Sequence, residues 1–101
     1  MRWQKLILIG EHKSHGGKLV KVIVLKSNSK ISDVSILGDF FIEPPDAITE
    51  LCNCLKGLTL DNYEALVKAL QSVVQDRGIK LYGIVIDDIV KAIEKAKPQG
   101  L

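Results

Sequence analysis

Residues 38–45 read Gly-Asp-Phe-Phe-Ile-Glu-Pro-Pro and mark the point at which strand-like sequence ends and helical sequence begins. In an extended chain successive side chains point to opposite faces, so Phe40 and Phe41 cannot enter one core unless the backbone bends between them. Proline fixes φ near the helical value at a first turn and keeps the preceding residue extended, so a helix is expected from Pro44 and Pro45 onward. The stretch therefore predicts strands before it and helices after it.

Three strands are expected before this stretch, at residues 3–9, 18–26 and 31–37. The segment that separates the first from the second carries charges, two histidines and a glycine pair, which is typical of a loop. The second strand places its valines on one face, but apolar residues also occupy the other face, at Leu19, Ile23 and Leu25. This second face is therefore expected to be partly covered too.

Three helices are expected after it, at residues 44–57, 61–78 and from about 87 to 98. Gly57 and Gly78 supply left-handed stops, and the spacing of Asp61 and Glu64 is close to a capping box. A short extended piece is expected near residues 80–82. Strands first and helices later predict an α+β fold, in which a small antiparallel three-stranded sheet packs with about three helices in a single domain spanning residues 1–101.

The composition is that of an ordinary soluble domain, with 47% hydrophobic and 26% charged residues. The net charge of +2 comes from bases spread thinly along the chain, so nucleic acid is not the expected partner. No apolar run approaches the roughly 20 residues that cross a bilayer, and no signal peptide is evident, so a cytoplasmic protein without a membrane partner is expected. Cys52 and Cys54, two apart on a helix, can neither bridge nor share one metal.

Two segments invite a chemical interpretation. Residues 16–18, Gly-Gly-Lys, have glycines and a lysine as phosphate loops do, but the glycine spacing, the missing Ser or Thr and the strand that follows favour a turn between strands. His12 and His15 lie three apart with Glu11 beside them and no clear fourth ligand, so solvated loop histidines are expected and no metal site. Asp87 and Asp88 are typical of a helix start.

Asp39 has two interpretations that the sequence leaves open. As a structural residue it would brace the strand-to-helix corner by accepting backbone N–H bonds. As a functional residue it would face a partner together with Phe40 or Phe41, since an aromatic anchor beside a charge is typical of binding hot spots.

Residues 31–41, Ile-Ser-Asp-Val-Ser-Ile-Leu-Gly-Asp-Phe-Phe, are followed by Pro44, a short amphipathic helix and Leu-Lys-Gly at 55–57. This order resembles the C-terminal accessory domain of lipoate-protein ligase A, which typically reads as a strand, then Gly-Asp-Phe-Phe, then a proline-started helix ending in Leu-x-Gly. Residues 13–18 resemble the glycine-bearing turn before its second strand, and residues 78–84 extend the resemblance into the last helix. With no large catalytic domain attached, the chain resembles the free-standing small subunit of a bipartite, archaeal-type ligase.

The resemblance implies a non-catalytic accessory subunit in a heterodimer with the catalytic large subunit of a lipoate-protein ligase. It would be required when that partner activates lipoate with ATP to lipoyl-AMP, before the lipoyl group passes to a lysine of an acceptor domain or of the H protein. ATP and lipoate would bind the partner, and this chain alone would hold no cofactor. The arginine-and-glycine loop and the adenylate-contacting lysine of the large domain have no counterpart here, so no catalytic residue is expected.

We expect the corner and the glycine turn to form part of the contact with the catalytic subunit, through Gly16, Gly17, Lys18, Gly38, Asp39, Phe40 and Phe41. The alternative, from a different class, is a stand-alone module that binds an unrelated protein or nucleic acid. A lipoyl carrier fits less well, because such carriers are all-β with a lysine at a hairpin tip, whereas the second half of this chain is helical.

Overall fold

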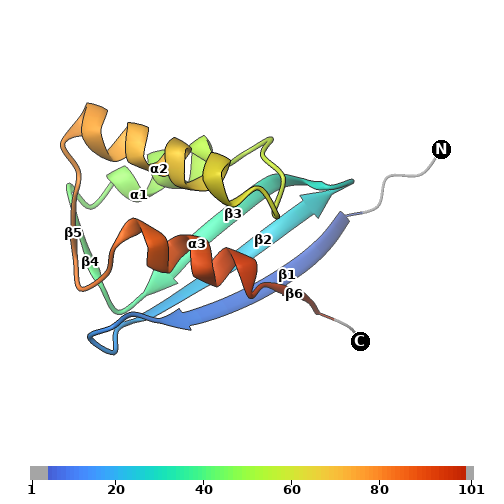
Figure 1. Ribbon diagram of the computed structural model, residues 1–101, viewed down its shortest axis with the longest axis horizontal. Helices are drawn as coiled ribbons and strands as arrows, with labels where there is room; N and C mark the ends of the chain where they lie inside the picture. The colour runs from blue at the N-terminus through green and yellow to red at the C-terminus, as the bar shows by residue number, and fades with distance from the viewer. Residues whose placement is uncertain (1–4, 100–101) are drawn as a thin grey trace.

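The computed structural model describes residues 5–99. Its elements follow one another as β1 (Lys5–Lys13), β2 (Leu19–Ser27), β3 (Lys30–Gly38), β4 (Phe41–Glu43), α1 (Ala47–Cys54), α2 (Tyr63–Arg77), β5 (Lys80–Tyr82), α3 (Ile86–Glu94) and β6 (Lys97–Pro98), as Figure 1 shows. One antiparallel sheet has the order β3-β2-β1-β6, and β4 pairs with β5 in a second, two-stranded sheet.

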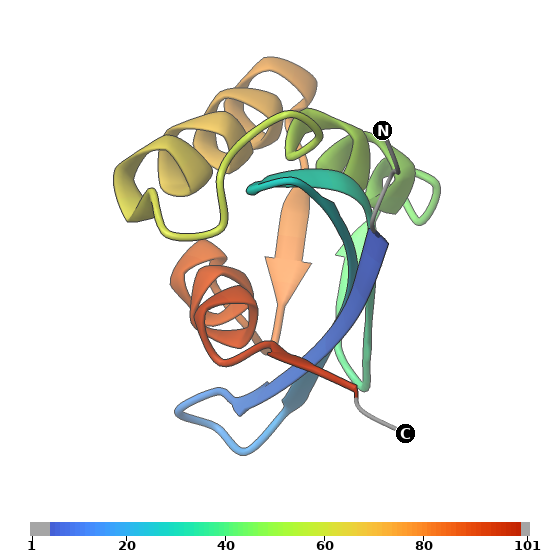
Figure 2. The same ribbon diagram turned by 90° about the vertical axis from the view of Figure 1, so that its right-hand side faces the viewer.

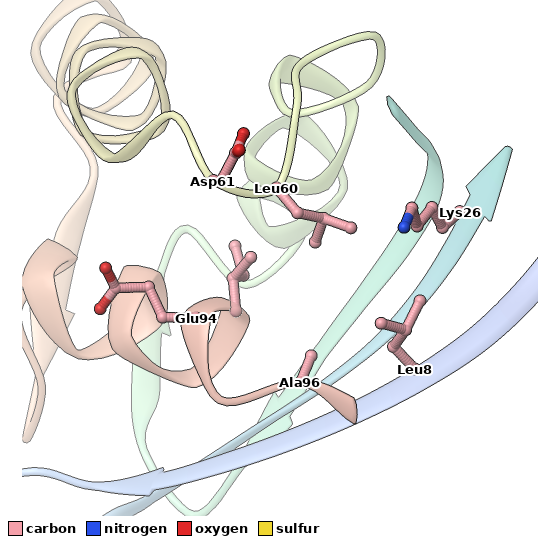
Figure 3. A pocket seen from close by; sticks show the side chains of 7 residues that line it. Leu8, Lys26, Leu60, Asp61, Glu94 and Ala96 are labelled. Atoms are coloured by element: carbon pink, nitrogen blue, oxygen red, sulfur yellow. The ribbon is translucent and has the colours of Figure 1, made fainter. Parts of the chain in front are cut away.

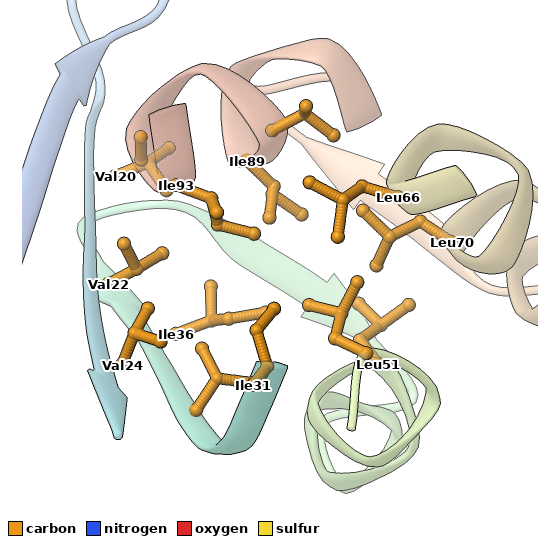
Figure 4. Close-up of a cluster of buried hydrophobic side chains, with 14 of the residues drawn as sticks. Val20, Val22, Val24, Ile31, Ile36, Leu51, Leu66, Leu70, Ile89 and Ile93 are labelled. Carbon is orange, nitrogen blue, oxygen red and sulfur yellow. The ribbon is translucent and has the colours of Figure 1, made fainter. Parts of the chain in front are cut away.

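The helices all lie on one face of the curved larger sheet (Figure 2). Side chains from this face and from the helices meet in a single core (Figure 4), in which the fully buried residues include Val20, Val22, Val24, Ile31, Leu51, Leu66, Leu70, Ile89 and Ile93. The valines of β2 point into it because alternate residues of a strand share a face. A register shift between Leu25 and Lys26 brings both Ile31 and Val34 of β3 into the core as well.

Gly10 sets how closely α3 approaches β1. A Cβ at this position would lie 2.7 Å from the Ala96 nitrogen and 2.8 Å from its Cα, with the carbonyl oxygen of Ala92 closer still. Only a residue without a side chain leaves room for this contact between backbone and backbone. The close approach lets Val90 and Ile93 of α3 reach the core.

The α+β class and the meander β1-β2-β3 are confirmed, but the expected count of three strands is wrong. The larger sheet has a fourth strand, because β6 pairs Pro98 with Leu8 and Lys97 with Ile9. The last helix therefore ends at Glu94 and not at Pro98. The first strand continues to Lys13 through residues expected to form a loop, and its expected first residues 3 and 4 lie outside the described residues.

The helix ends follow local chemistry, with two corrections. The helix expected from Pro44 begins at Ala47, whose N–H donates to the Pro44 carbonyl at 3.0 Å across a turn. The second helix is capped by Asn62, whose side chain accepts from the Ala65 N–H at 3.2 Å, and not by Asp61. Gly57 and Gly78 have positive φ, as expected for helix stops.

The short extended piece expected near residues 80–82 is confirmed as β5. Among residues 5–99, no helix has both the length and the apolar character that crossing a membrane requires.

Candidate docking site

Asp39 braces the corner at the end of β3. Its Oδ1 accepts from the Leu19 N–H at 2.7 Å, and its own N–H donates to the Leu19 carbonyl at 3.3 Å. Gly38 is needed beside it, because a Cβ there would meet the Leu19 carbonyl and lie 2.8 Å from the Phe40 ring. The structural interpretation of Asp39 is confirmed, and the corner is tied to the start of β2.

Phe40 and Phe41 point to different environments, as the alternation predicts. Phe40 packs against the core, whereas the side chain of Phe41 is 74% exposed. Phe41 lies opposite Tyr82 in the β4–β5 pair, and the Tyr82 hydroxyl donates to Glu43 Oε1 at 3.3 Å. The exposed aromatic pair therefore stands on a short ribbon that is anchored from behind by Ile42 and Leu81.

The glycine turn is a tight connection between β1 and β2, as expected. Gly17 has φ 88° and donates to the Ser14 carbonyl at 2.9 Å, while the Ser14 N–H donates to the Lys18 carbonyl at 2.8 Å. The Ser14 hydroxyl accepts from the Lys18 N–H at 3.1 Å. The N–H groups of Ser14, Gly17 and Lys18 therefore donate to atoms within the turn, which fits a hairpin connection and not a phosphate loop.

The turn and the aromatic pair lie at the same end of the molecule, at the left of Figure 1. The loop after β5 joins them: a Cβ on Gly83 would lie 3.0 Å from Lys18 Cγ, and Val85, which is 60% exposed, borders a hollow of about 290 Å³ beside Gly16. We name this region the end surface and define it by Gly16, Lys18, Phe41, Tyr82, Gly83 and Val85.

The end surface includes some of the expected interface residues but not all of them. Phe41, Gly16 and Lys18 lie on it, whereas Phe40 faces the core and Asp39 is engaged with Leu19. That any of these residues binds a partner stays a prediction. The sequence analysis missed Tyr82 and Val85, because only the pairing of β4 with β5 places them beside Phe41.

His12 is not a solvated loop residue, which corrects the expectation. It lies on β1, where its Nε2 is 3.3 Å from Asp88 Oδ1 and its Nδ1 is 2.8 Å from Lys95 Nζ. Asp88 also accepts from the Val85 N–H at 2.9 Å, so it stabilises the first turn of α3, in agreement with its expected place at a helix start. Because the ammonium group of Lys95 can only donate, Nδ1 accepts and Nε2 is left to donate to Asp88. Both ring nitrogens therefore make contacts within the fold.

The two cysteines are half-buried and unpaired with each other. Burial raises the pKa of the Cys54 thiol to about 11, and burial also raises the pKa of Cys52. The Cys54 thiol donates to the Leu51 carbonyl within its own helix at 3.1 Å. A thiol that resists ionisation is a poor nucleophile and a poor metal ligand, so these residues fit a packing role.

A hollow of about 420 Å³ lies between the ends of α3 and β2, far from the end surface (Figure 3). Lys26, Asp61 and Glu94 stand around apolar side chains, and no serine, cysteine or histidine is among the residues that line it. Within residues 5–99, no cluster of three or more histidine, cysteine or acidic side chains could hold a metal ion.

Comparison with known families agrees with the resemblance seen in the sequence. The family model of the bacterial lipoate protein ligase C-terminus matches residues 11–93. The chain belongs to this family. Lipoate-protein ligase A subunit 2 of Thermoplasma acidophilum is 25% identical over 75 residues, which are 74% of this chain and 76% of that protein.

A solved structure shares the fold of this ligase C-terminal domain. It belongs to an archaeal lipoylation system of Thermoplasma acidophilum, described as a bi-partite lipoate protein ligase and its E2 lipoyl domain. The superposition has a TM-score of 0.74 at 23% identity and covers 89% of this chain and 97% of the other.

Proposed function

We propose that this chain is the non-catalytic accessory subunit of a bipartite lipoate-protein ligase and takes part in protein lipoylation. The observation that carries the proposal is the family match over residues 11–93, supported by the relative that is a separate subunit 2. The chain is required, in this proposal, when a catalytic partner activates lipoate with ATP to lipoyl-AMP. The pair would act in the cytoplasm as a heterodimer.

The chemistry belongs to the partner. ATP and lipoate bind to the catalytic subunit, which also passes the lipoyl group to a lysine of an acceptor domain or of the H protein. This chain contributes no reacting group, since His12 is fully engaged and the Cys54 thiol has a raised pKa. Its contribution is a docking surface that holds the partner in an arrangement competent for adenylation.

Such an effect requires differential binding, because a subunit shifts a conformational equilibrium only if it binds one state more tightly than the other. The end surface suits this role. Phe41, Tyr82 and Val85 are exposed apolar groups on short elements, and Lys18 adds a charge beside them. The aromatic pair would contact loops of the catalytic subunit near its adenylation site. This contact would favour the closed arrangement of those loops.

The test separates the two half-reactions. Both subunits are purified, and pyrophosphate release from ATP and lipoate is measured with and without this chain. Transfer of the lipoyl group from preformed lipoyl-AMP to an acceptor domain is measured in parallel. We expect pyrophosphate release to depend on this chain and transfer to proceed without it. Unchanged adenylation on adding the chain refutes the proposal.

A pair of substitutions tests the end surface. Phe41→Ala is expected to lower pyrophosphate release by about tenfold or more, because truncating an aromatic hot spot of an interface costs about 2 kcal/mol or more. Tyr63→Ala on α2 removes an aromatic side chain from a residue that is 37% exposed and lies away from the end surface, so it should leave the rate unchanged. Salt-dependent binding of nucleic acid, with no effect on any ligase, would instead favour the stand-alone module.

A further inference from the structure

The buried polar side chains of the described part of the chain lie close together. Among residues 5–99, the buried polar or charged residues are Ser14 and Asp88, which are 7% and 9% exposed. Both line the hollow beside Gly16, where the turn between β1 and β2 faces the loop that leads into α3. Burying a polar group is costly unless its hydrogen bonds are made, so the partners of these side chains determine how this corner is built.

Asp88 holds the loop between β5 and α3. Its Oδ2 accepts from the Val85 N–H at 2.9 Å, and its own N–H donates to the Val85 carbonyl at 3.0 Å. These two bonds fix the backbone of Val85 at the first turn of α3, while the residue stays 60% exposed. The loop runs only from Gly83 to Val85 and begins directly after Tyr82. The carboxylate of Asp88 therefore sets the place of Val85 on the end surface.

His12 in turn holds this carboxylate. Asp88 Oδ1 lies 3.3 Å from His12 Nε2, so each carboxylate oxygen has a different partner. The side chains of His12 and Asp88 are only 15% and 12% exposed, which leaves little water to replace their contact. The ring is carried by β1, an inner strand of the larger sheet, opposite the fully buried Val20. Without His12, Oδ1 would lose its partner at a site that water barely reaches, and the carboxylate would turn outward and release Val85.

The second contact of the ring lies in a different environment. His12 Nδ1 is 2.8 Å from Lys95 Nζ, but Lys95 is exposed at the end of α3. Contacts of exposed charged groups stabilise a fold little, because water competes for both partners. The contact with Asp88 is enough by itself to keep a proton on Nε2, since a carboxylate accepts and does not donate. The link from His12 to the loop therefore runs through Asp88.

We propose that His12 is a positioning residue of the docking surface, which holds Asp88 and thereby keeps Val85 and the loop after β5 in a fixed place beside the glycine turn. The inference rests on the proposed function for its consequence in the ligase. A loop that is already held in its bound position loses less freedom when a partner binds. His12 acts through Asp88 and does not itself contact the partner.

The first experiment uses the isolated chain and two amide variants. In His12→Gln the side chain is long enough to place an N–H donor near the position of Nε2, whereas in His12→Asn the shorter side chain reaches only the position of Nδ1. The exchange rate of the Val85 N–H is measured by NMR and divided by that of Leu70, which is buried in α2 and reports opening of the whole domain. We expect this ratio to rise by about tenfold in His12→Asn and to change by less than about twofold in His12→Gln.

Lys95→Ala is the matched control. It removes the other contact of the same ring and leaves the one with Asp88, so the exchange ratio of Val85 should stay as in the unsubstituted chain. If His12 contributed only to the stability of the whole fold, its substitution would speed the exchange of Leu70 and leave the ratio unchanged. An unchanged ratio in His12→Asn therefore overturns the inference.

The second experiment measures pyrophosphate release by the catalytic subunit at increasing concentrations of each variant. The concentration that gives half-maximal release should rise about fivefold for His12→Asn and stay within about twofold for His12→Gln and Lys95→Ala. The plateau should be the same for all variants, because the groups that dock are unchanged.

The outcomes separate this inference from the proposed function. If the exchange ratio rises in His12→Asn but the half-maximal concentration does not, the loop is not part of the docking contact and the inference is wrong, while the proposed function stands. If the unsubstituted chain does not stimulate pyrophosphate release, the proposed function fails, and the role of His12 in docking fails with it.

Discussion

Substituting Gly10 tests the closest backbone contact in the fold. In Gly10→Ala the new Cβ would lie 2.7–2.8 Å from two backbone atoms of Ala96 and closer to the carbonyl of Ala92, whereas ordinary contacts begin at 3.4 Å. The end of α3 must therefore move by more than about 0.7 Å, and no flexible side chain can absorb the shift. Overpacking of this kind costs about 1–3 kcal/mol, and contact with backbone favours the upper half of that range.

The assay is chemical denaturation followed by circular dichroism. We expect the free energy of unfolding to fall by about 2–3 kcal/mol and the midpoint temperature by roughly 10–20 °C, with the denaturant slope unchanged. Gly16→Ala is the matched control, because a Cβ there meets nothing within 4 Å and its φ is not left-handed. A loss below about 0.5 kcal/mol for Gly10→Ala would refute the assigned packing of α3 on β1.

Three further predictions concern local interactions. Asp39→Ala removes the acceptor for the Leu19 N–H and should lower the free energy of unfolding by about 1 kcal/mol, measured by denaturant titration. Asn62→Ala removes the cap of α2 and should cost about 1 kcal/mol by the same measurement, whereas Asp61→Ala should cost little. Because the pKa of Cys54 is raised to about 11, its reaction with a thiol reagent at pH 8 should be about 100-fold slower in the folded chain than in denaturant; equal rates would contradict this. The raised pKa also means that stability falls as pH rises from 9 to about 11, since the unfolded thiol ionises first.

The parts of the fold that the sequence predicted are those with local causes. The valines of β2 alternate with period two, and Gly57 and Gly78 stop helices because they accept positive φ. The corner at residues 38–45 follows from glycine and proline chemistry. The residue type of Asp39 alone suggested that it braces the corner. Its partner, the N–H of Leu19 twenty residues away, could be identified only from the structure.

The parts that the sequence did not predict depend on pairing across the chain. Residues 11–13 are charged and looked like a loop, yet the alternation of β1 continues through them, with His12 turned inward onto Asp88. Pro98 stops helices, but at the edge of a sheet it can also sit in a strand, which is where β6 places it. The sequence predicted Phe41 as part of the end surface but missed Tyr82. Tyr82 lies beside Phe41 only because β4 and β5, which are far apart in the sequence, pair with each other.

Neighbouring residues of β2 should contribute unequally to stability. Val22 is fully buried in the core, whereas Ile23 points to the opposite face of the sheet, away from the helices. Val22→Thr keeps the shape of the side chain but buries a hydroxyl, so the free energy of unfolding should fall by about 1–3 kcal/mol. Ile23→Thr keeps β-branching on a face that water already reaches in the free chain, so its unfolding energy should change by less than about 1 kcal/mol.

Denaturant titration of the two variants measures this difference. Equal losses of unfolding free energy would contradict the assignment of Val22 to the core and of Ile23 to the face that the helices leave uncovered.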